Sequence, residues 1–174
     1  MSESVPIEPE LLKWYREKDE VIFDVVPHSH LDYAWYRDRE SSKMREIEAF
    51  VKTVTVDRFT LEQMITAKEF VEGGGKQIKQ DLLDMIREGR MELISMYTQP
   101  DVFLSPQELE FWNFEFGERV ARELGGEPSV DKYLPDSFGQ PRTAPMVAKH
   151  AGKRSIISMR GFEHDWPLFM WESP

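Results

Sequence analysis

The sequence predicts an α/β fold in which parallel strands are connected by helical crossovers. Short runs rich in β-branched and aromatic residues alternate with helical segments along the 174 residues, an alternation typical of a parallel sheet. Hydrophobic residues make up 40% of the chain and aromatic residues 12%, enough for one packed domain. About five strands fit the pattern, which suffices for an open sheet or part of a β/α barrel but not for a closed eight-stranded one.

The first elements are a helix, a buried strand and a second helix. Residues 9–19 have helical periodicity, residues 21–27 (VIFDVVP) are typical of a buried strand, and the charged residues 39–54 predict a helix. Thr60 and Gln63 have the spacing of a capping box, so a further helix is expected from there to about residue 72, before three consecutive glycines.

Strand and helix signals continue to alternate after these glycines. Residues 76–88 predict a helix whose apolar side chains share one stripe: Ile78, Leu82, Met85 and Ile86. A long helix is expected to start with Ser105 as N-cap, Pro106 at the first helical position and Glu108 in the first turn, and to end near Gly125. The remaining expected elements are strands at 91–97, 130–134 and 155–159 and a helix at 142–151.

Charge and composition exclude several functions. The net charge of −10 disfavours binding to nucleic acid and to anionic membrane surfaces. The chain has no cysteine, so any metal would be held by His, Asp and Glu rather than by thiolates. Residues 1–10 are acidic and lack an apolar signal segment, and no apolar run reaches the length of a membrane span. We therefore expect a soluble cytoplasmic protein.

The sharpest chemical feature is the segment HSHLD at residues 28–32, which directly follows the strand predicted at 21–27. Side chains alternate along an extended chain, so His28, His30 and Asp32 can point to one side. Two imidazoles and a carboxylate at the end of a strand suit zinc or a similar divalent ion. A polar loop with one backbone-bonded histidine is the alternative, and three potential ligands in alternation favour the metal site.

Other polar and aromatic side chains also follow predicted strands. Asp136 can ligate a metal, act as a base or act as a nucleophile, or can simply stabilise a turn. Asp101 has a weaker functional case, and a loop role is expected for it. Arg160 can position an anion or a carboxylate, or can lie on the surface. Trp35, with its neighbouring tyrosines, can stack on a sugar ring, although aromatic residues more often cap the edge of a core.

At these residues the sequence resembles the glycoside hydrolase family 38 α-mannosidases. The matching segments are HSHLDYAW at 28–35, EGRMELISMYTQPD at 88–101, PDSFGQP at 135–141, MRG at 159–161 and FMWESP at 169–174. The resemblance runs from about residue 22 and implies that residues 1–174 are the N-terminal portion of the catalytic domain. It also implies a partial, distorted β/α barrel as the fold.

The resemblance implies a role for each matched residue. His30, Asp32 and Asp136 are implied zinc ligands, and Asp136 is also the implied nucleophile of a retaining hydrolysis that passes through a covalent glycosyl-enzyme. Zinc would bind the 2- and 3-hydroxyls of the mannose. Trp35 is implied to pack against the sugar and Arg160 to lie near the nucleophile. His28 occupies a motif position that is not a direct ligand.

The resemblance covers only part of such an enzyme. The remaining histidine ligand and the acid/base aspartate are expected beyond residue 174, so the isolated chain is not expected to turn over its α-mannoside substrate. Homo-oligomerisation is expected to use the remaining domains. Two alternatives stay open from the residues themselves: a zinc-dependent amidohydrolase or deacetylase, and a non-catalytic carbohydrate-binding remnant.

Overall fold

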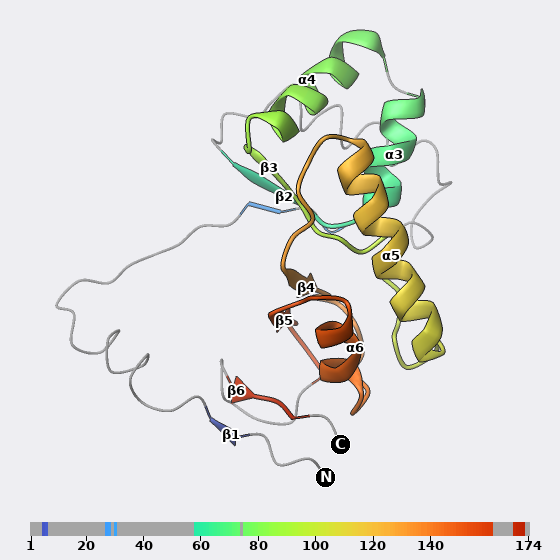
Figure 1. Cartoon of the computed structure of the whole chain (residues 1–174), viewed down its shortest axis with the longest axis vertical. Coiled ribbons are helices and arrows are strands. Elements are labelled where there is room, and N and C mark those ends of the chain that lie inside the picture. Colours follow the sequence, from blue (N-terminus) through green and yellow to red (C-terminus); the bar gives the residue numbers. More distant parts are fainter. Residues whose placement is uncertain are drawn as a thin grey trace, which may run out of the picture.

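The structure is a computed structural model that describes residues 5–6, 27–28, 30, 58–73, 75–161 and 169–172. Within these residues the chain has an α/β fold with parallel strands, as the sequence predicts (Figure 1). The helices expected at 9–19 and 39–54, and all but the last residue of the strand expected at 21–27, lie outside the described residues.

Two pairs of strands are parallel. β2 (Phe59–Leu61) pairs with β3 (Met91–Leu93), and β4 (Asp131–Tyr133) pairs with β5 (Ser155–Ile157). The three strands predicted at 91–97, 130–134 and 155–159 therefore exist but are shorter than expected.

Two isolated parallel bridges connect further segments of the chain to these strands. One joins His28 to Thr60 of β2, and another joins Leu93 of β3 to Pro128, just before β4. A third pair, β1 (Val5–Pro6) with β6 (Phe169–Met170), is antiparallel and was not predicted. The described strands thus form three two-stranded sheets, which do not by themselves establish a partial barrel.

The described helices are α3 (Met64–Gly73), α4 (Lys76–Arg87), α5 (Gln107–Glu123) and α6 (Ala144–His150). Helix α4 confirms the predicted apolar stripe, since Leu82, Met85 and Ile86 are buried and Ile78 packs against the same core. None of the helices in the described part of the chain is both long and apolar enough to cross a membrane.

The predicted capping box at Thr60 is wrong. Thr60 lies in β2, and its hydroxyl donates a hydrogen bond to the carboxylate of Glu92 on β3, at 3.0 Å. Helix α3 begins only at Met64, where the N–H groups of Met64 and Ile65 donate to the carbonyls of Met96 and Tyr97. Backbone carbonyls from the segment after β3 therefore replace the expected side-chain cap.

The same segment explains why β3 is shorter than predicted. Ile94 still donates to Leu61 of β2, but the carbonyls of Met96 and Tyr97 accept from α3, and the N–H of Tyr97 donates to the carbonyl of Asn113 on α5. The predicted start of α5 is also wrong by one position. Pro106 is the N-cap, and the hydroxyl of Ser105 donates to the carbonyl of Asp101 instead of capping the helix.

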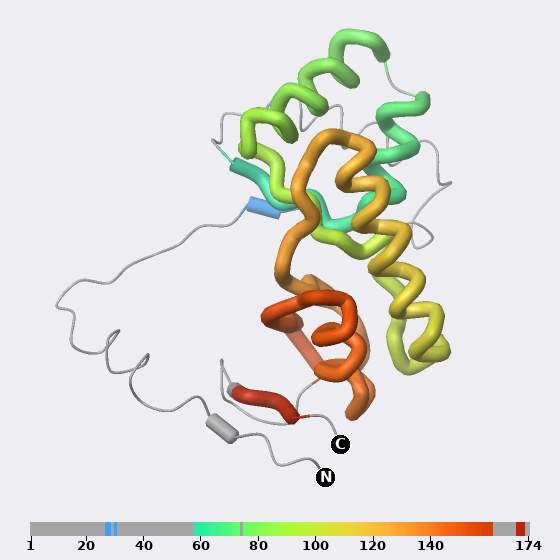
Figure 2. Tube along the Cα trace, in the orientation of Figure 1, coloured from blue at the N-terminus to red at the C-terminus, as the bar shows by residue number. Residues whose placement is uncertain are grey.

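Helix α5 connects two hydrophobic cores. Val120 and Ala121 belong to a core between α3, α4, β2 and β3, whereas Phe114 belongs to a second core with Tyr133 and Val147. Figure 2 shows α5 running alongside both groups of elements. Gly117 permits this close approach, because a Cβ there would overlap the backbone carbonyl of Ser95.

Candidate active site

Three charged side chains follow the carboxyl ends of parallel strands. Glu62 directly follows β2, Asp136 lies three residues after β4, and Arg160 lies three residues after β5. His30 lies two residues after His28, which pairs with β2. Parallel α/β folds place ligand sites at this edge of the sheet, because the strand ends and the loops after them converge there.

His30 contacts two carboxylates through its two ring nitrogens. Its Nδ1 lies 3.3 Å from Oε2 of Glu62, and its Nε2 lies 3.7 Å from Oδ2 of Asp136. The Glu62 side chain is fully buried, whereas the side chains of His30 and Asp136 are 32% and 40% exposed. The structure thus brings together two of the three predicted metal ligands at a position that solvent can reach.

Arg160 forms an ion pair with Asp136, in which its guanidinium contacts Oδ1. The guanidinium also lies 4.7 Å from the ring centroid of Phe138. Backbone pairing places the two charged residues together, since the N–H of Met159 donates to the carbonyl of Pro135 at 3.2 Å. Arg160 is thus an exposed arginine whose guanidinium, with its side chain 49% exposed, is held against the Asp136 carboxylate.

Two glycines allow the Asp136 loop and the Arg160 segment to touch. Gly139 has φ 146° and Gly161 has φ 88°, both in the region that favours glycine. A Cβ on Gly161 would overlap the Cα of Gly139. Gly139 is thus part of the geometry that pairs Asp136 with Arg160.

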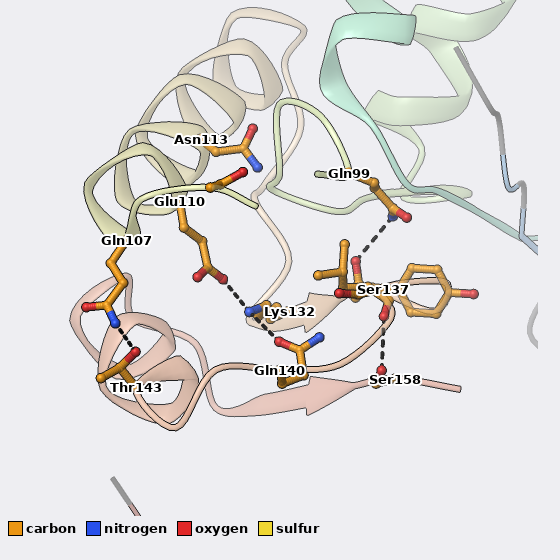
Figure 3. A network of polar contacts seen from close by, with 12 residues as sticks. Gln99, Gln107, Glu110, Asn113, Lys132, Ser137, Gln140, Thr143 and Ser158 are labelled. Atoms are coloured by element: carbon orange, nitrogen blue, oxygen red, sulfur yellow. Dashed lines mark hydrogen bonds and ion pairs between the residues drawn. The ribbon is translucent and has the colours of Figure 1, made fainter. Parts of the chain in front are cut away.

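Buried polar contacts hold the loop that carries Asp136 (Figure 3). Lys132 on β4 forms a buried ion pair with Glu110 on α5 and donates to the side-chain oxygen of Gln140 at 3.1 Å. Burial lowers the pKa of Lys132, and the nearby Glu110 carboxylate opposes that shift. Within the loop, the hydroxyl of Ser137 donates to the carbonyl of Gly139 at 2.7 Å.

His28 lies in a different environment from His30. The hydroxyl of Tyr133 lies 3.0 Å from Nδ1 of His28, and the two rings meet edge to face at 5.3 Å. Burial, together with the negative charge of Glu62, raises the pKa of Tyr133 to about 12, so the phenol stays protonated. His28 thus contacts a phenol, whereas His30 contacts two carboxylates.

The predicted site extends beyond the described residues. Asp32 and Trp35 lie outside the described residues. Among the residues that the structure does describe, no group of three or more His, Asp or Glu side chains is arranged to hold a metal ion. Asp101 has the expected loop role, since its carboxylate accepts a hydrogen bond from the N–H of Phe103.

Glu62 was missed by the sequence reasoning. The capping-box interpretation of Thr60 and Gln63 assigned it to the first turn of a helix, where a carboxylate needs no further explanation. The available signal was the FTL run before it, which is typical of a short strand and makes Glu62 another strand-end carboxylate.

Comparison with solved structures supports the fold. An alpha-mannosidase from Enterococcus faecalis V583 aligns with a TM-score of 0.67 and 23% identity, covering 76% of this chain and 16% of the other. A glycosyl hydrolase family 38 protein from Enterococcus faecalis gives 0.59 and 22%, over 75% of this chain and 16% of its own. A 4-alpha-glucanotransferase from Thermococcus litoralis gives 0.54 and 15%, over 78% and 21%. At these identities the alignments show the fold alone.

Sequence comparison shows the family. A relative from Halalkalibacterium halodurans, named "Putative mannosylglycerate hydrolase", is 24% identical over 172 residues, covering 86% of this chain. The chain spans only 19% of that relative's length. The model of the N-terminal domain of glycosyl hydrolases family 38 matches residues 20–173, nearly the whole chain. The chain therefore belongs to glycosyl hydrolase family 38.

Proposed function

We propose that the complete gene product is a zinc-dependent retaining α-mannosidase, in which Asp136 is the nucleophile. The observation that carries the proposal is the cluster of His30, Asp136 and Arg160 at the carboxyl ends of the parallel strands. Family membership favours a glycosidase over an amidohydrolase. The names of the relatives suggest the substrate class, α-mannosides, with mannosylglycerate as one candidate.

The donor set fits a zinc ion. His30 presents Nε2 toward Oδ2 of Asp136, and both side chains are partly exposed, so a cation at this edge would meet one imidazole and one carboxylate. Asp32 is the third proposed ligand, and a histidine elsewhere in the gene product is the fourth. When bound, zinc supplies a Lewis acid that holds sugar hydroxyls and stabilises the developing charge.

Asp136 has the chemistry that a retaining nucleophile needs. The Arg160 guanidinium contacts Oδ1 and leaves Oδ2 facing the His30 side of the site. The carboxylate attacks the anomeric carbon, the glycosidic oxygen leaves with a proton from a general acid, and water then cleaves the glycosyl ester. The general acid is proposed to come from another part of the gene product, and Trp35 to pack against the sugar.

The test is hydrolysis of 4-nitrophenyl α-mannoside and mannosylglycerate by the complete gene product. Asp136→Asn should lower kcat by at least about 10⁴-fold, because removal of a nucleophile leaves only the other catalytic groups. Asp101→Asn is the matched control, since the Asp101 carboxylate lies in a turn and accepts a hydrogen bond from the N–H of Phe103, and it should retain activity. Wild-type rates for Asp136→Asn, or a product of inverted anomeric configuration, would contradict the proposal.

A further inference from the structure

Strand register places Glu62 beside His30. His28 forms a parallel bridge with Thr60, and residues two positions further along parallel chains remain neighbours. His30 and Glu62 are those residues, and their side chains meet at 3.3 Å between Nδ1 and Oε2. The contact therefore follows from the backbone pairing and not from a chance approach of two long side chains.

Burial makes this contact energetically important. The Glu62 side chain has no exposed surface, and a carboxylate taken out of water needs hydrogen-bond donors or a positive charge nearby. The ring N–H of His30 is such a donor. The His30 side chain is partly exposed, so the pair links a buried carboxylate to a side chain that solvent can reach.

The contact also fixes which nitrogen of His30 faces the site. A carboxylate is only an acceptor, so a neutral His30 that bonds Glu62 carries its proton on Nδ1. Its Nε2 then presents a lone pair toward Oδ2 of Asp136, at 3.7 Å. An imidazole lone pair and a carboxylate oxygen do not bond each other, but both can bind the same cation.

From this geometry we propose that Glu62 is a positioning residue for the metal site. It holds Nδ1–H of His30 by a hydrogen bond, which sets the tautomer and ring orientation and directs Nε2 to the ion. Carboxylate–histidine–metal relays of this kind raise ligand basicity and metal affinity. The inference rests on the proposed zinc dependence of the same site and adds to it a residue that does not contact metal or substrate.

The first experiment measures zinc affinity of the complete gene product by competition with a chelator. Glu62→Gln keeps the shape and one acceptor oxygen, and should weaken zinc binding about 10-fold, whereas Glu62→Leu should weaken it about 100-fold. Glu118→Gln is the matched control, because Glu118 is also a largely buried carboxylate but lies on α5, where its charged partners are Lys153 and Arg122. It should leave zinc affinity unchanged.

The outcomes separate this inference from the proposed function. If the wild-type protein binds no zinc, the proposed metal dependence fails and the positioning role falls with it. If wild type binds zinc and both Glu62 variants match it, only the positioning role is overturned. An equal loss in Glu118→Gln would assign the effect to general destabilisation and would also overturn it.

A second measurement covers the case in which the Glu62 variants do not fold. The crystal structure of the zinc-loaded wild-type protein should show Nε2 of His30 on the metal and Nδ1 within hydrogen-bond distance of Glu62. Ligation through Nδ1, direct ligation by Glu62, or loss of the His30–Glu62 contact in that structure would each overturn the proposal.

Discussion

Nε2 of His30 lies 3.7 Å from Oδ2 of Asp136, although one residue precedes β2 and the other follows β4. The fold brings them together because each lies just beyond the carboxyl end of a parallel-paired segment. The second oxygen of Asp136 contacts Arg160. One carboxylate thus faces an imidazole and a guanidinium, and each partner can be tested separately.

Replacement of Arg160 should impair catalysis more than substrate binding. Arg160→Gln removes the positive charge that orients Oδ1 of Asp136, and a displaced nucleophile costs about 100-fold in kcat for a shift of about 1 Å. Steady-state kinetics on an α-mannoside measure the change. Arg154→Gln, at an exposed arginine before β5, serves as the control. An unchanged kcat in Arg160→Gln would show that the ion pair has no catalytic role.

Gly161→Ala should reduce both stability and activity. The positive φ disfavours alanine by roughly 1–2 kcal/mol, and the added methyl group would overlap Gly139 next to the Asp136 loop. Gly152→Ala is a matched control, because Gly152 has φ 70° but no atom within 4 Å of the added methyl. We expect a similar fall in Tm from backbone strain in both variants, with a further fall in Tm and a loss of kcat only in Gly161→Ala. Equal kcat in the two variants would argue against this steric coupling.

Much of the fold follows from local patterns. The apolar stripe of α4 and the glycines at its end and at the end of α5 predict both helices to within about two residues. Elements whose ends depend on tertiary contacts were less predictable. The first N–H groups of α3 donate to the carbonyls of Met96 and Tyr97. A capping motif consists of neighbouring residues, so it cannot reveal hydrogen-bond acceptors that come from a distant segment.

The proximity of the candidate site residues was predictable where a charged or imidazole side chain follows a strand signal in the sequence. His30, Asp136 and Arg160 each follow a strand signal, and the structure brings all three together. Glu62 is different, because its contact with His30 depends on the register between two segments that are far apart in sequence. Strand pairing, rather than composition or spacing, makes that carboxylate part of the site.

Removal of one partner of the buried ion pair Lys132–Glu110 should lower the stability of the protein strongly, whereas removal of both partners should lower it much less. Lys132→Met leaves Glu110, which is 2% exposed, without its buried cation and should destabilise the protein by about 3–5 kcal/mol. The double variant Lys132→Met/Glu110→Leu removes both charges and should recover most of that loss. Thermal unfolding of the two variants measures the difference. If the double variant is as unstable as the single one, the cost lies in the lost contact with Gln140 rather than in an unpaired charge.

Glu118 should make stability depend on acidic pH. Burial by itself raises the pKa of Glu118, but the hydrogen bonds and charges of Lys153 and Arg122 outweigh burial and hold the pKa below its usual 4.5. Because the folded-state pKa is depressed, this stabilisation is present above pH 4.5 and is lost as the pH falls through the folded pKa.

Thermal unfolding of wild type and Glu118→Gln between about pH 6 and about pH 3 tests this pH dependence. Wild type should be the more stable at the upper end, where Glu118 accepts a hydrogen bond from the buried Lys153 at 2.8 Å. The difference in Tm should shrink on acidification, because protonated Glu118 and glutamine are both neutral. A difference that stays constant across this range would mean that the two proteins differ in packing and not in the charge of residue 118.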